Sequence, residues 1–319
     1  KMSKQAKGMK SVTNLAFEST YATQPTSGKW YVQPINKNEL TGKQSLIQSN
    51  TITGRRDMTE PGLGQIDASG QLELPLDARN VGNMLKGILG APTTTAGDTE
   101  GLYKHVFTVT DDIPSMTIEK GFPDIGLFFQ YLGVKFDKFS LTAQVGNNET
   151  TYTIDTMAAN EVETKATVAT SPTTLAITRF NNVNAAVKEG GTALVTCRKM
   201  QLDINNNLDG DTYCLNGSSM RPSINEGLAE VSGNIETLFE DDAQLKKAME
   251  STETSLELTF TRDKFSLTFS IAEVILERAT PGISGPKGIT QTLNYRGYFA
   301  NDSGNSIITV TLINDVASY

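Results

Sequence analysis

The sequence contains very little histidine, tryptophan and cysteine, with one, one and two residues of these types among 319. A Ser-His-Asp or Cys-His mechanism would therefore have to use His105. His105 lies in an alternating aromatic strand pattern, so we interpret it as a packed or interface histidine and not as a general base. A zinc site needs several histidine or cysteine ligands, which this chain does not bring together in sequence. These absences predict no catalytic residue and no metal site.

The sequence also lacks the motifs that bind phosphate-containing cofactors. No glycine-rich loop ends in Lys-Ser or Lys-Thr, and no strand-glycine-helix dinucleotide fingerprint occurs. The 36 carboxylates could always form a glycosidase pair in space, but sequence spacing does not reveal one. We therefore expect no cofactor and no enzymatic activity.

The two cysteines, Cys197 and Cys214, form neither a CxxC metal pair nor a dense disulfide framework. We interpret them as reduced core residues, with a disulfide across a hairpin as the alternative. No apolar run approaches the roughly 20 residues that a membrane helix needs. Residues 1–7 are basic but precede no apolar run, so we expect no secretory signal, no membrane contact, and a protein made and used without export.

Positive charge is in deficit, because 28 Lys and Arg face 36 Asp and Glu and give a formal net charge of -8. Proteins that grip nucleic acid by neutralising phosphates need the opposite balance. With 38% hydrophobic and 20% charged residues, the chain is apolar enough to bury a core. We therefore expect a folded protein that does not bind DNA specifically.

Residues 205–211, Asn-Asn-Asn-Leu-Asp-Gly-Asp, resemble the first half of a calcium loop, with alternating oxygen ligands and a glycine in sixth place. The twelfth position is Asn216, where a bidentate glutamate is required. We therefore favour a tight turn between strands over a calcium site.

One segment of the sequence occurs twice. Residues 64–73 read GQIDASGQLE and residues 227–236 read GLAEVSGNIE, so two glycines, a serine and a glutamate are identical without a gap. In both copies a helix signal follows, with an aspartate as N-cap and apolar residues at helical spacing. These residues are Asp77, Val81, Met84, Leu85 and Ile88, ended by Gly90 and Pro92, in the first copy, and Asp241, Leu245, Ala248 and Met249 in the second.

Alternating strands follow each predicted helix. Residues 103–109 precede a turn at Asp111-Asp112, and residues 256–260 precede a turn at Arg262-Asp263, which predicts one hairpin in each half. Each half is also expected to close with a strand, turn and strand, through residues 146–148 in the first half and 301–305 in the second.

These patterns predict a mainly β fold with two tandem β-sandwich or barrel modules, each with one flanking α-helix. Residues 1–29 are polar and lysine-bearing, and we expect them to form an N-terminal arm outside the first core. The first module is assigned to residues 30–165 and the second to residues 166–319. The Thr, Ser and Ala rich stretch from Glu161 to Leu175 is the expected linker.

Several stretches resemble the tail tube proteins of siphophages, in the duplicated form in which one chain carries two tube modules. The first is Glu-Ser-Thr-Tyr-Ala-Thr-Gln-Pro at residues 18–25, where Ala22 replaces the family's usual glycine. The others are residues 49–57, 64–75 and 77–80, then LYKHVFTV at 102–109 with SMTIEKG at 115–121, and residues 195–208 as a second-module start.

The resemblance implies a ring of six tube modules whose inner sheets pair edge to edge around a lumen. If each chain supplies two modules, three chains form the ring. The rings stack into a tube that conducts the genome during ejection. The implied partners are further copies of the chain, the tape-measure protein, the tail terminator and double-stranded DNA passing without specific binding. The implied location is the virion tail, with assembly in the host cytoplasm.

Two sets of residues are candidates for contacts in such a tube. Strand alternation separates the apolar residues of both copies from a polar face, which we assign to the lumen because its acidic and small residues recur without lysine or arginine. This face comprises Asp67, Ser69, Gln71 and Glu73, and Glu230, Ser232, Asn234 and Glu236. The long segments 53–63 and 216–226 are expected to contact the adjacent ring, through Arg55, Arg56, Asp57 and Glu60 in the first. A solvent-exposed loop is the alternative.

Two other classes of function stay open at this stage. A head-tail completion protein or a secretion-tube-like structural protein would form isolated rings or monomers and no long tubes. A glycan-binding or glycan-hydrolysing β-sandwich would need a concave aromatic cluster, whereas Trp30 is the single tryptophan and lies near the arm.

Overall fold

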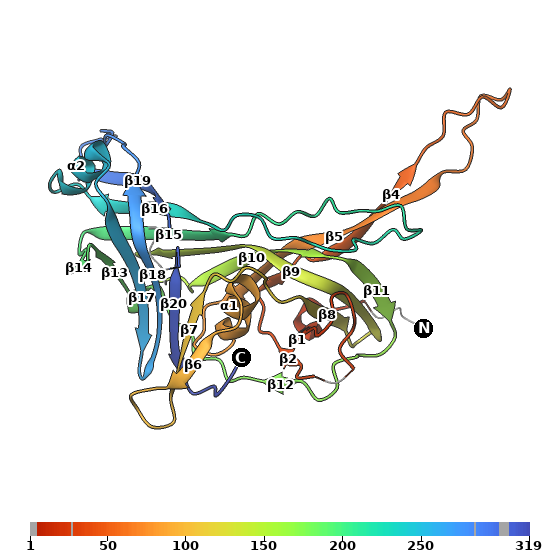
Figure 1. Cartoon of the computed structure of the whole chain (residues 1–319), viewed down its shortest axis with the longest axis horizontal. Coiled ribbons are helices and arrows are strands. Elements are labelled where there is room, and N and C mark those ends of the chain that lie inside the picture. Colours follow the sequence, from red (N-terminus) through yellow and green to blue (C-terminus); the bar gives the residue numbers. More distant parts are fainter. Residues whose placement is uncertain (1–4, 27, 284, 300–305) are drawn as a thin grey trace.

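The computed structural model describes residues 5–26, 28–283, 285–299 and 306–319, and its fold is mainly β. Figure 1 shows a broad sheet crossing the molecule, a smaller sheet beneath it, and a β4–β5 hairpin that projects away from the body. The predicted mainly β fold class is therefore confirmed. In the described part of the chain the α-helices are α1 (Val81–Leu89) and α2 (Ala243–Glu250).

The first half of the chain contains most of the strands. They are β1 (Val12–Phe17), β2 (Tyr31–Val32), β3 (Lys37–Asn38), β4 (Thr41–Ile47), β5 (Gly62–Pro75), β6 (Thr93–Ala96), β7 (Tyr103–Thr108), β8 (Met116–Phe122), β9 (Leu127–Gln144), β10 (Thr151–Ala158), β11 (Asn160–Thr164) and β12 (Thr173–Thr174). Those of the second half are β13 (Ala185–Glu189), β14 (Thr192–Ala193), β15 (Cys197–Asn205), β16 (Glu230–Leu238), β17 (Thr254–Arg262), β18 (Phe265–Leu276), β19 (Thr290–Gly297) and β20 (Thr309–Asn314). Short 3-10 helices span Gly8–Lys10 and Asn182–Asn184.

The broad sheet is antiparallel and runs in the order β4, β5, β10, β9, β15, β16, β19, β18. The two halves of the chain meet inside it, where β9 pairs with β15 from Lys138 opposite Asn205 to Gln144 opposite Lys199. A shared ladder of backbone hydrogen bonds therefore joins the halves.

Strand β9 belongs to two sheets. Its first part pairs with β8 and β11, whereas its second part pairs with β10 and β15. The smaller sheet continues from β8 through β1 to β2. Because β9 turns from one sheet into the other, the two layers face each other and enclose the core around Phe136 and Phe139, which are fully buried.

The strand pairings of the first half recur in the second half in the same chain order. The pairs β4–β5, β5–β10, β10–β9, β9–β8, β9–β11 and β8–β1 have the counterparts β15–β16, β16–β19, β19–β18, β18–β17, β18–β20 and β17–β13. Ser69 and Ser232 hold matching places in β5 and β16, as the repeated segment predicts.

The first helix lies beneath the broad sheet (Figure 1), and its predicted apolar stripe is buried completely. Asp77 does not cap it directly. Its carboxylate accepts hydrogen bonds from the backbone amides of Arg79 and Asn80 at 2.8 and 2.9 Å. These bonds fix a turn before the helix begins at Val81. The second helix lies at the surface, because Ala248 is its one buried residue while Met249 is 52% exposed.

Three local expectations need correction. The hairpin turning at Asp111-Asp112 is absent, because β7 pairs with β6 and with β20 of the other half, and β8 pairs with β1 and β9. Part of the expected arm, β1, lies inside the core with Leu15 and Ala16 buried. The expected linker begins inside β11 and includes β12, which pairs with β2.

The predicted turn at residues 146–148 joins β9 to β10 as expected, whereas residues 301–305 lie outside the described part.

Candidate assembly surfaces

The broad sheet has one face on the core and one polar face. In β5, Leu72 and Leu74 are buried, while Ser69, Gln71 and Glu73 alternate with them and are half-buried on the opposite side. Asp67, on the same side, is exposed. Alternation along a strand produces this separation, so the residues that we predicted to share a face do so.

The matching strand β16 has the same polarity. Val231 and Ile235 are buried against the core, and the predicted polar residues point the other way. Those residues are Glu230, which is exposed, and Ser232, Asn234 and Glu236, which are half-buried. The polar face continues across β10, β9, β15 and β19, which lie between or beside these two strands.

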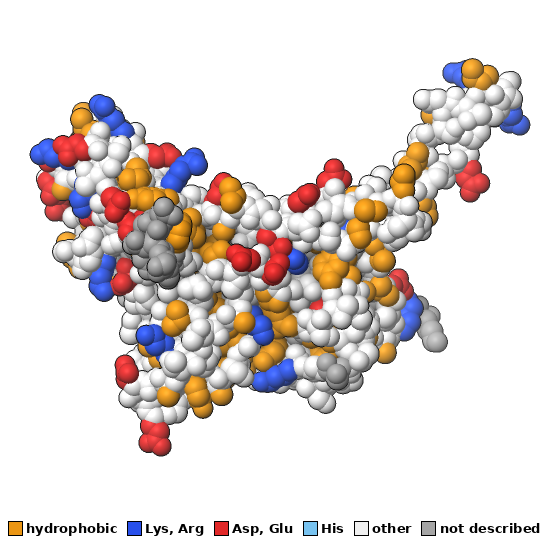
Figure 2. Space-filling view, viewed as in Figure 1, with side chains coloured by type: hydrophobic (Ala, Val, Ile, Leu, Met, Phe, Trp, Pro, Cys, Tyr) orange, Lys and Arg blue, Asp and Glu red, His pale blue; other side chains and the backbone are white. Residues whose placement is uncertain are grey.

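The eight predicted residues include no lysine or arginine, but the face as a whole carries mixed charge. Neighbouring strands and loops place cations beside the carboxylates, with ion pairs from Lys138 to Asp203 at 3.5 Å, Arg198 to Glu236 at 3.8 Å and Arg221 to Asp67 at 2.6 Å. Figure 2 shows acidic and basic side chains together along the hollowed side between the hairpin and the lobe that carries α2. The repeated segment alone could not reveal these partners, because they come from other parts of the chain.

The hairpin between β4 and β5 ends in residues 48–61, which we call the tip segment. Arg55, Arg56, Asp57 and Glu60 all lie in it and are exposed, and Arg55 pairs with Asp57 of the same segment at 2.5 Å. Exposed apolar side chains accompany them. These are Leu46, Ile47, Ile52, Met58 and Leu63, each more than half exposed. Exposed apolar groups on a projecting ribbon indicate a surface that another molecule covers.

The corresponding connection in the second half, residues 206–229, lies against the first half of its own chain, and we call it the clamp loop. Arg221 donates to Asp67 and to the carbonyl of Ala158, and Glu226 pairs with Lys135 at 2.6 Å. A small apolar cluster adds Leu208 and Ile224, packed on Ile113. Residues 221–226 of the segment 216–226 are therefore held against the first half, whereas residues 216–220 are mostly exposed. Contact of this segment with an adjacent ring stays a prediction.

The calcium-like segment at the start of the clamp loop is a structural junction. The Asn206 side chain donates to the carbonyls of Ile88 and Phe136 at 2.9 and 3.0 Å, and that of Asn207 donates to Leu228. Among the described residues no group of three or more His, Cys, Asp or Glu side chains could hold a metal ion. The segment opens a long loop and not the tight turn that we favoured.

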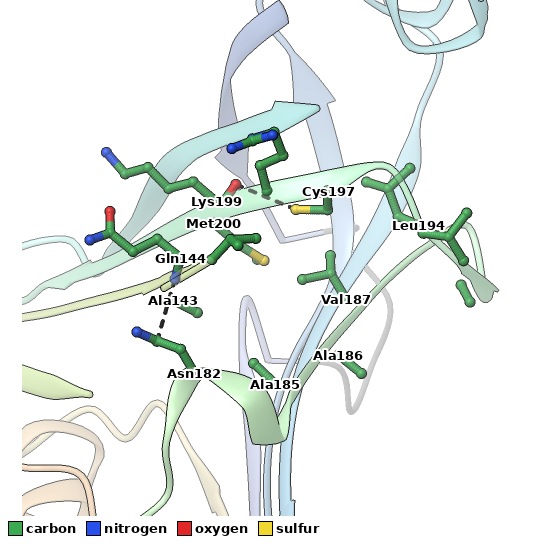
Figure 3. A pocket seen from close by; sticks show the side chains of 14 residues that line it. Ala143, Gln144, Asn182, Ala185, Ala186, Val187, Leu194, Cys197, Lys199 and Met200 are labelled. Carbon is green, nitrogen blue, oxygen red and sulfur yellow. Dashed lines mark hydrogen bonds between the residues drawn. The ribbon is translucent and has the colours of Figure 1, made fainter. Parts of the chain in front are cut away.

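A pocket of about 250 Å³ lies between the end of β9, the start of β15 and the β13–β14 hairpin (Figure 3). Val187, Leu194, Cys197 and Met200 contribute much of its apolar lining. Burial raises the pKa of the Cys197 thiol to about 11, so it stays protonated at neutral pH and is a weak nucleophile. Both cysteines are free, and Cys214 is exposed, which corrects its assignment to the core.

A family model described as "Phage tail tube protein" matches residues 8–297. The chain belongs to the phage tail tube protein family. Members of this family are structural proteins, and this chain is accordingly a structural subunit of a phage tail tube, located in the virion tail. It assembles with further copies of itself and with other tail components. No curated protein matches the chain.

In a tail tube subunit the surfaces that contact other copies matter more than any pocket. Sequence reasoning identified the tip segment through its length and one polar face through alternation. It missed the β9–β15 junction and the clamp loop, because both depend on pairing between residues far apart in the chain. A signal for the junction was the alternation of Phe139, Leu141 and Ala143 with polar residues at the end of β9.

No helix in the described part of the chain is long and apolar enough to cross a membrane.

Proposed function

We propose that three copies of this chain close into a ring, and that the rings stack into the conduit through which the genome leaves the particle. The observation that carries this proposal is the recurrence of the strand pairings in two halves that already sit side by side in one sheet. Each chain then fills two positions of a pseudo-sixfold ring. We place the duplicated unit from β1 to β11 and again from β13 to β20, in place of the predicted boundaries 30–165 and 166–319.

The free edges of the broad sheet favour ring closure. Within the described residues β4 pairs with β5 on one side only, so no second strand covers its other edge. Exposed edges invite further strand pairing, and closure into a ring removes them. The β9–β15 ladder provides a model, inside one chain, for the contact that closes the ring.

The polar face is the proposed lumen wall. Its residues Asp67, Ser69, Gln71, Glu73, Glu230, Ser232, Asn234 and Glu236 recur in two halves of the chain, and a ring would present each set three times. Of the cations beside them, Lys138, Arg198 and Arg221 form ion pairs with carboxylates. Lys43 and Lys199 lie opposite Asp67 and Glu236 in neighbouring strands, so basic and acidic side chains alternate across the face and leave no purely basic patch for DNA phosphates. Double-stranded DNA could then pass without specific binding.

The tip segment is the proposed contact to the adjacent ring, through Arg55, Arg56, Asp57 and Glu60 and the exposed apolar side chains near them. At the ends of the tube the same surfaces would meet the tail terminator, and the lumen would enclose the tape-measure protein until ejection. Assembly would take place in the host cytoplasm, before the tail joins the particle.

Electron microscopy of the purified, concentrated protein tests this proposal. Long tubes built from rings of three chains would support it. Isolated rings or monomers under all conditions would favour a head-tail completion role, and rings of six chains would remove the two-position arrangement.

A further inference from the structure

We propose that the side chains of Asn38, Lys120 and Glu161 cap the free edge of the broad sheet, and that a second copy of the chain displaces this cap when it pairs with the edge. This inference rests on the proposed self-assembly into rings. The inference identifies the edge strand, the residues that cap this strand and the register in which the second copy binds.

The edge strand consists of β3 and β4, which pair with β5 in one continuous register, from Lys37 opposite Glu73 to Thr41 opposite Ser69. Between them, the Glu39 amide donates to the carbonyl of Gln71 at 2.9 Å. Backbone groups in an antiparallel strand point alternately to its two edges. The N–H and C=O groups of Leu40 and Gly42 therefore point away from β5, toward the free edge.

Side chains of the same chain satisfy these outward groups. The Gly42 amide donates to Oε2 of Glu161 at 2.8 Å, and the Leu40 amide donates to Oδ1 of Asn38 at 3.1 Å. The Leu40 carbonyl accepts a hydrogen bond from Nζ of Lys120. Three backbone groups that could bind a neighbouring strand are thus occupied.

The cap is held by further contacts behind the edge. The Asn38 amide group donates to the Thr13 hydroxyl at 3.0 Å, and Lys120 lies over the ring of Tyr131 at 5.2 Å from its centre. Burial lowers the pKa of Lys120, and the nearby charge of Glu161 opposes this effect. Charged side chains at an edge strand discourage unwanted pairing with other chains.

The other half of the chain shows what the same backbone positions do when they are not capped. Because Ser69 and Ser232 match, Leu40 and Gly42 correspond to Leu202 and Ile204 of β15. Those two residues pair with Leu141 and Phe139 of β9. The positions that carry the cap in the first half therefore carry the strand junction in the second.

The same comparison identifies the strand that would replace the cap. In the second half, β19 corresponds to β10 and β18 to β9, with Asn294 in the place of Asp155. The amide of Glu277, directly after β18, donates to the carbonyl of Asn294 at 2.8 Å, so Glu277 holds the place of Lys138.

Lys138 pairs with Asn205, whose counterpart on the free edge is Lys43. A second copy that repeats the internal junction would therefore set its Glu277 opposite Lys43. Both residues are exposed, and their charges are opposite, so the pairing is electrostatically favourable. This complementarity supports a second copy of the chain as the occupant of the edge.

The cap is tested by Glu161→Ala, with Glu163→Ala on the same strand as control, because Glu163 is exposed and its carboxylate pairs with Lys165 and not with the edge strand in the described part of the chain. Losing a charge-assisted hydrogen bond should raise the open fraction of the edge roughly tenfold. We expect a correspondingly shorter lag in tube formation by light scattering, faster hydrogen exchange at residues 40–42, and wild-type behaviour of the control. An unchanged lag and unchanged exchange in a folded Glu161→Ala variant would overturn the cap. If that variant does not fold, Glu161→Gln, which keeps an acceptor oxygen, should fold and show a smaller acceleration, and no acceleration at all would overturn the cap equally.

The register is tested by disulfide trapping in a Cys197→Ser, Cys214→Ser background. Chains with Lys43→Cys, mixed with chains with Glu277→Cys, should form an intermolecular disulfide on assembly, because opposite residues in neighbouring strands lie within bonding distance. The control pairs Glu277→Cys with Ser45→Cys, further along the same edge, and should not cross-link. Tubes that form without the first disulfide would overturn the register and leave the proposed function standing. A wild-type chain that never forms tubes would count against the proposed function itself.

Discussion

His105, the single histidine of the sequence, is part of the packed interior. Its ring is fully buried between three elements. The Thr94 hydroxyl lies 2.8 Å from Nδ1, and the Val316 carbonyl lies 2.8 Å from Nε2. Since a carbonyl can only accept, Nε2 carries a proton. Burial lowers the pKa of His105 below its ordinary value of 6.5, so the ring is neutral at pH 7 and Nδ1 accepts from the Thr94 hydroxyl.

This environment predicts a pH dependence of stability. The unfolded chain protonates His105 near pH 6.5, whereas the folded chain does so only at lower pH. Below pH 6.5 the unfolded state thus binds more protons, and the free energy of unfolding decreases as the pH falls toward the folded-state pKa. Above pH 6.5 the contribution is fully present. Urea unfolding at steps of about half a pH unit between pH 5 and 8 measures the slope of the free energy of unfolding against pH.

The control for this prediction is His105→Gln, which removes the titrating group. The variant should be less stable at pH 7 because a buried hydrogen-bonded ring is lost, but its stability should change less between pH 6.5 and 5 than that of the wild type. Equal slopes for the two proteins would show that carboxylates alone cause the acid sensitivity.

At the scale of elements, two glycines show how closely the paired strands approach. A Cβ atom at Gly70 would lie 2.2 Å from the carbonyl oxygen of Glu39, and one at Gly233 would lie 2.0 Å from that of Gln201. Both contacts are with backbone, which cannot move aside as a side chain can. The two glycines hold the same position of the repeated segment, so the same close approach of two strands occurs once in each half.

We expect Gly233→Ala to disrupt the β15–β16 ladder. The added methyl group must push the backbone of Gln201 away. This should lower the free energy of unfolding by about 1–3 kcal/mol. Gly62→Ala is the matched control in β5, because a Cβ atom there has nothing within 4 Å. Denaturant unfolding of both variants measures the difference, and equal stabilities would contradict the predicted clash.

The clamp loop gives a second prediction for an element. Arg221→Ala removes hydrogen bonds to Asp67, Ala158 and Gly210, so we expect a loss of about 1–3 kcal/mol and faster proteolysis within residues 206–229. Arg55→Ala is the control, since the Arg55 side chain is 76% exposed and should contribute less than about 0.5 kcal/mol. A clamp loop that resists protease equally in both variants would contradict its proposed attachment.

Local periodicity explains which elements the sequence predicts. The α1 stripe and the two faces of β5 and β16 depend on spacing within one segment, and the structure agrees with them. The prediction of a hairpin at Asp111-Asp112 was wrong because β7 pairs with β20. Val310 of β20 lies opposite Phe107, although about 200 residues separate them in sequence. The cations on the polar face escaped detection for the same reason. Cross-strand neighbours are set by topology, which one strand does not contain.

At the scale of the whole molecule, the tip segment and the polar face carry the assembly predictions. Deleting residues 55–60 should leave a folded protein, because these residues are exposed and project from the body (Figure 1). The deletion should abolish tube formation while circular dichroism and unfolding stay near wild type. Normal tubes from this variant would show that the segment does not connect rings.

Lysine substitutions test the lumen assignment. Glu73→Lys with Glu236→Lys adds cations to the polar face, where they should hold DNA phosphates and slow DNA passage, with a smaller effect at higher salt. Tube assembly should persist. Glu100→Lys, in an exposed turn between β6 and β7, is the control and should leave the ejection rate unchanged. A normal ejection rate in the double variant would contradict the assignment of this face to the lumen.

The proposed arrangement gives one chain two adjacent positions in a closed ring. Electron cryomicroscopy of tubes assembled from the purified protein tests it most directly, because it counts the chains in each ring and locates β5 and β16. The account predicts three chains per ring, with Glu73 and Glu236 on the inner wall. Rings of six chains, or rings in which these carboxylates line the outer surface, would contradict it.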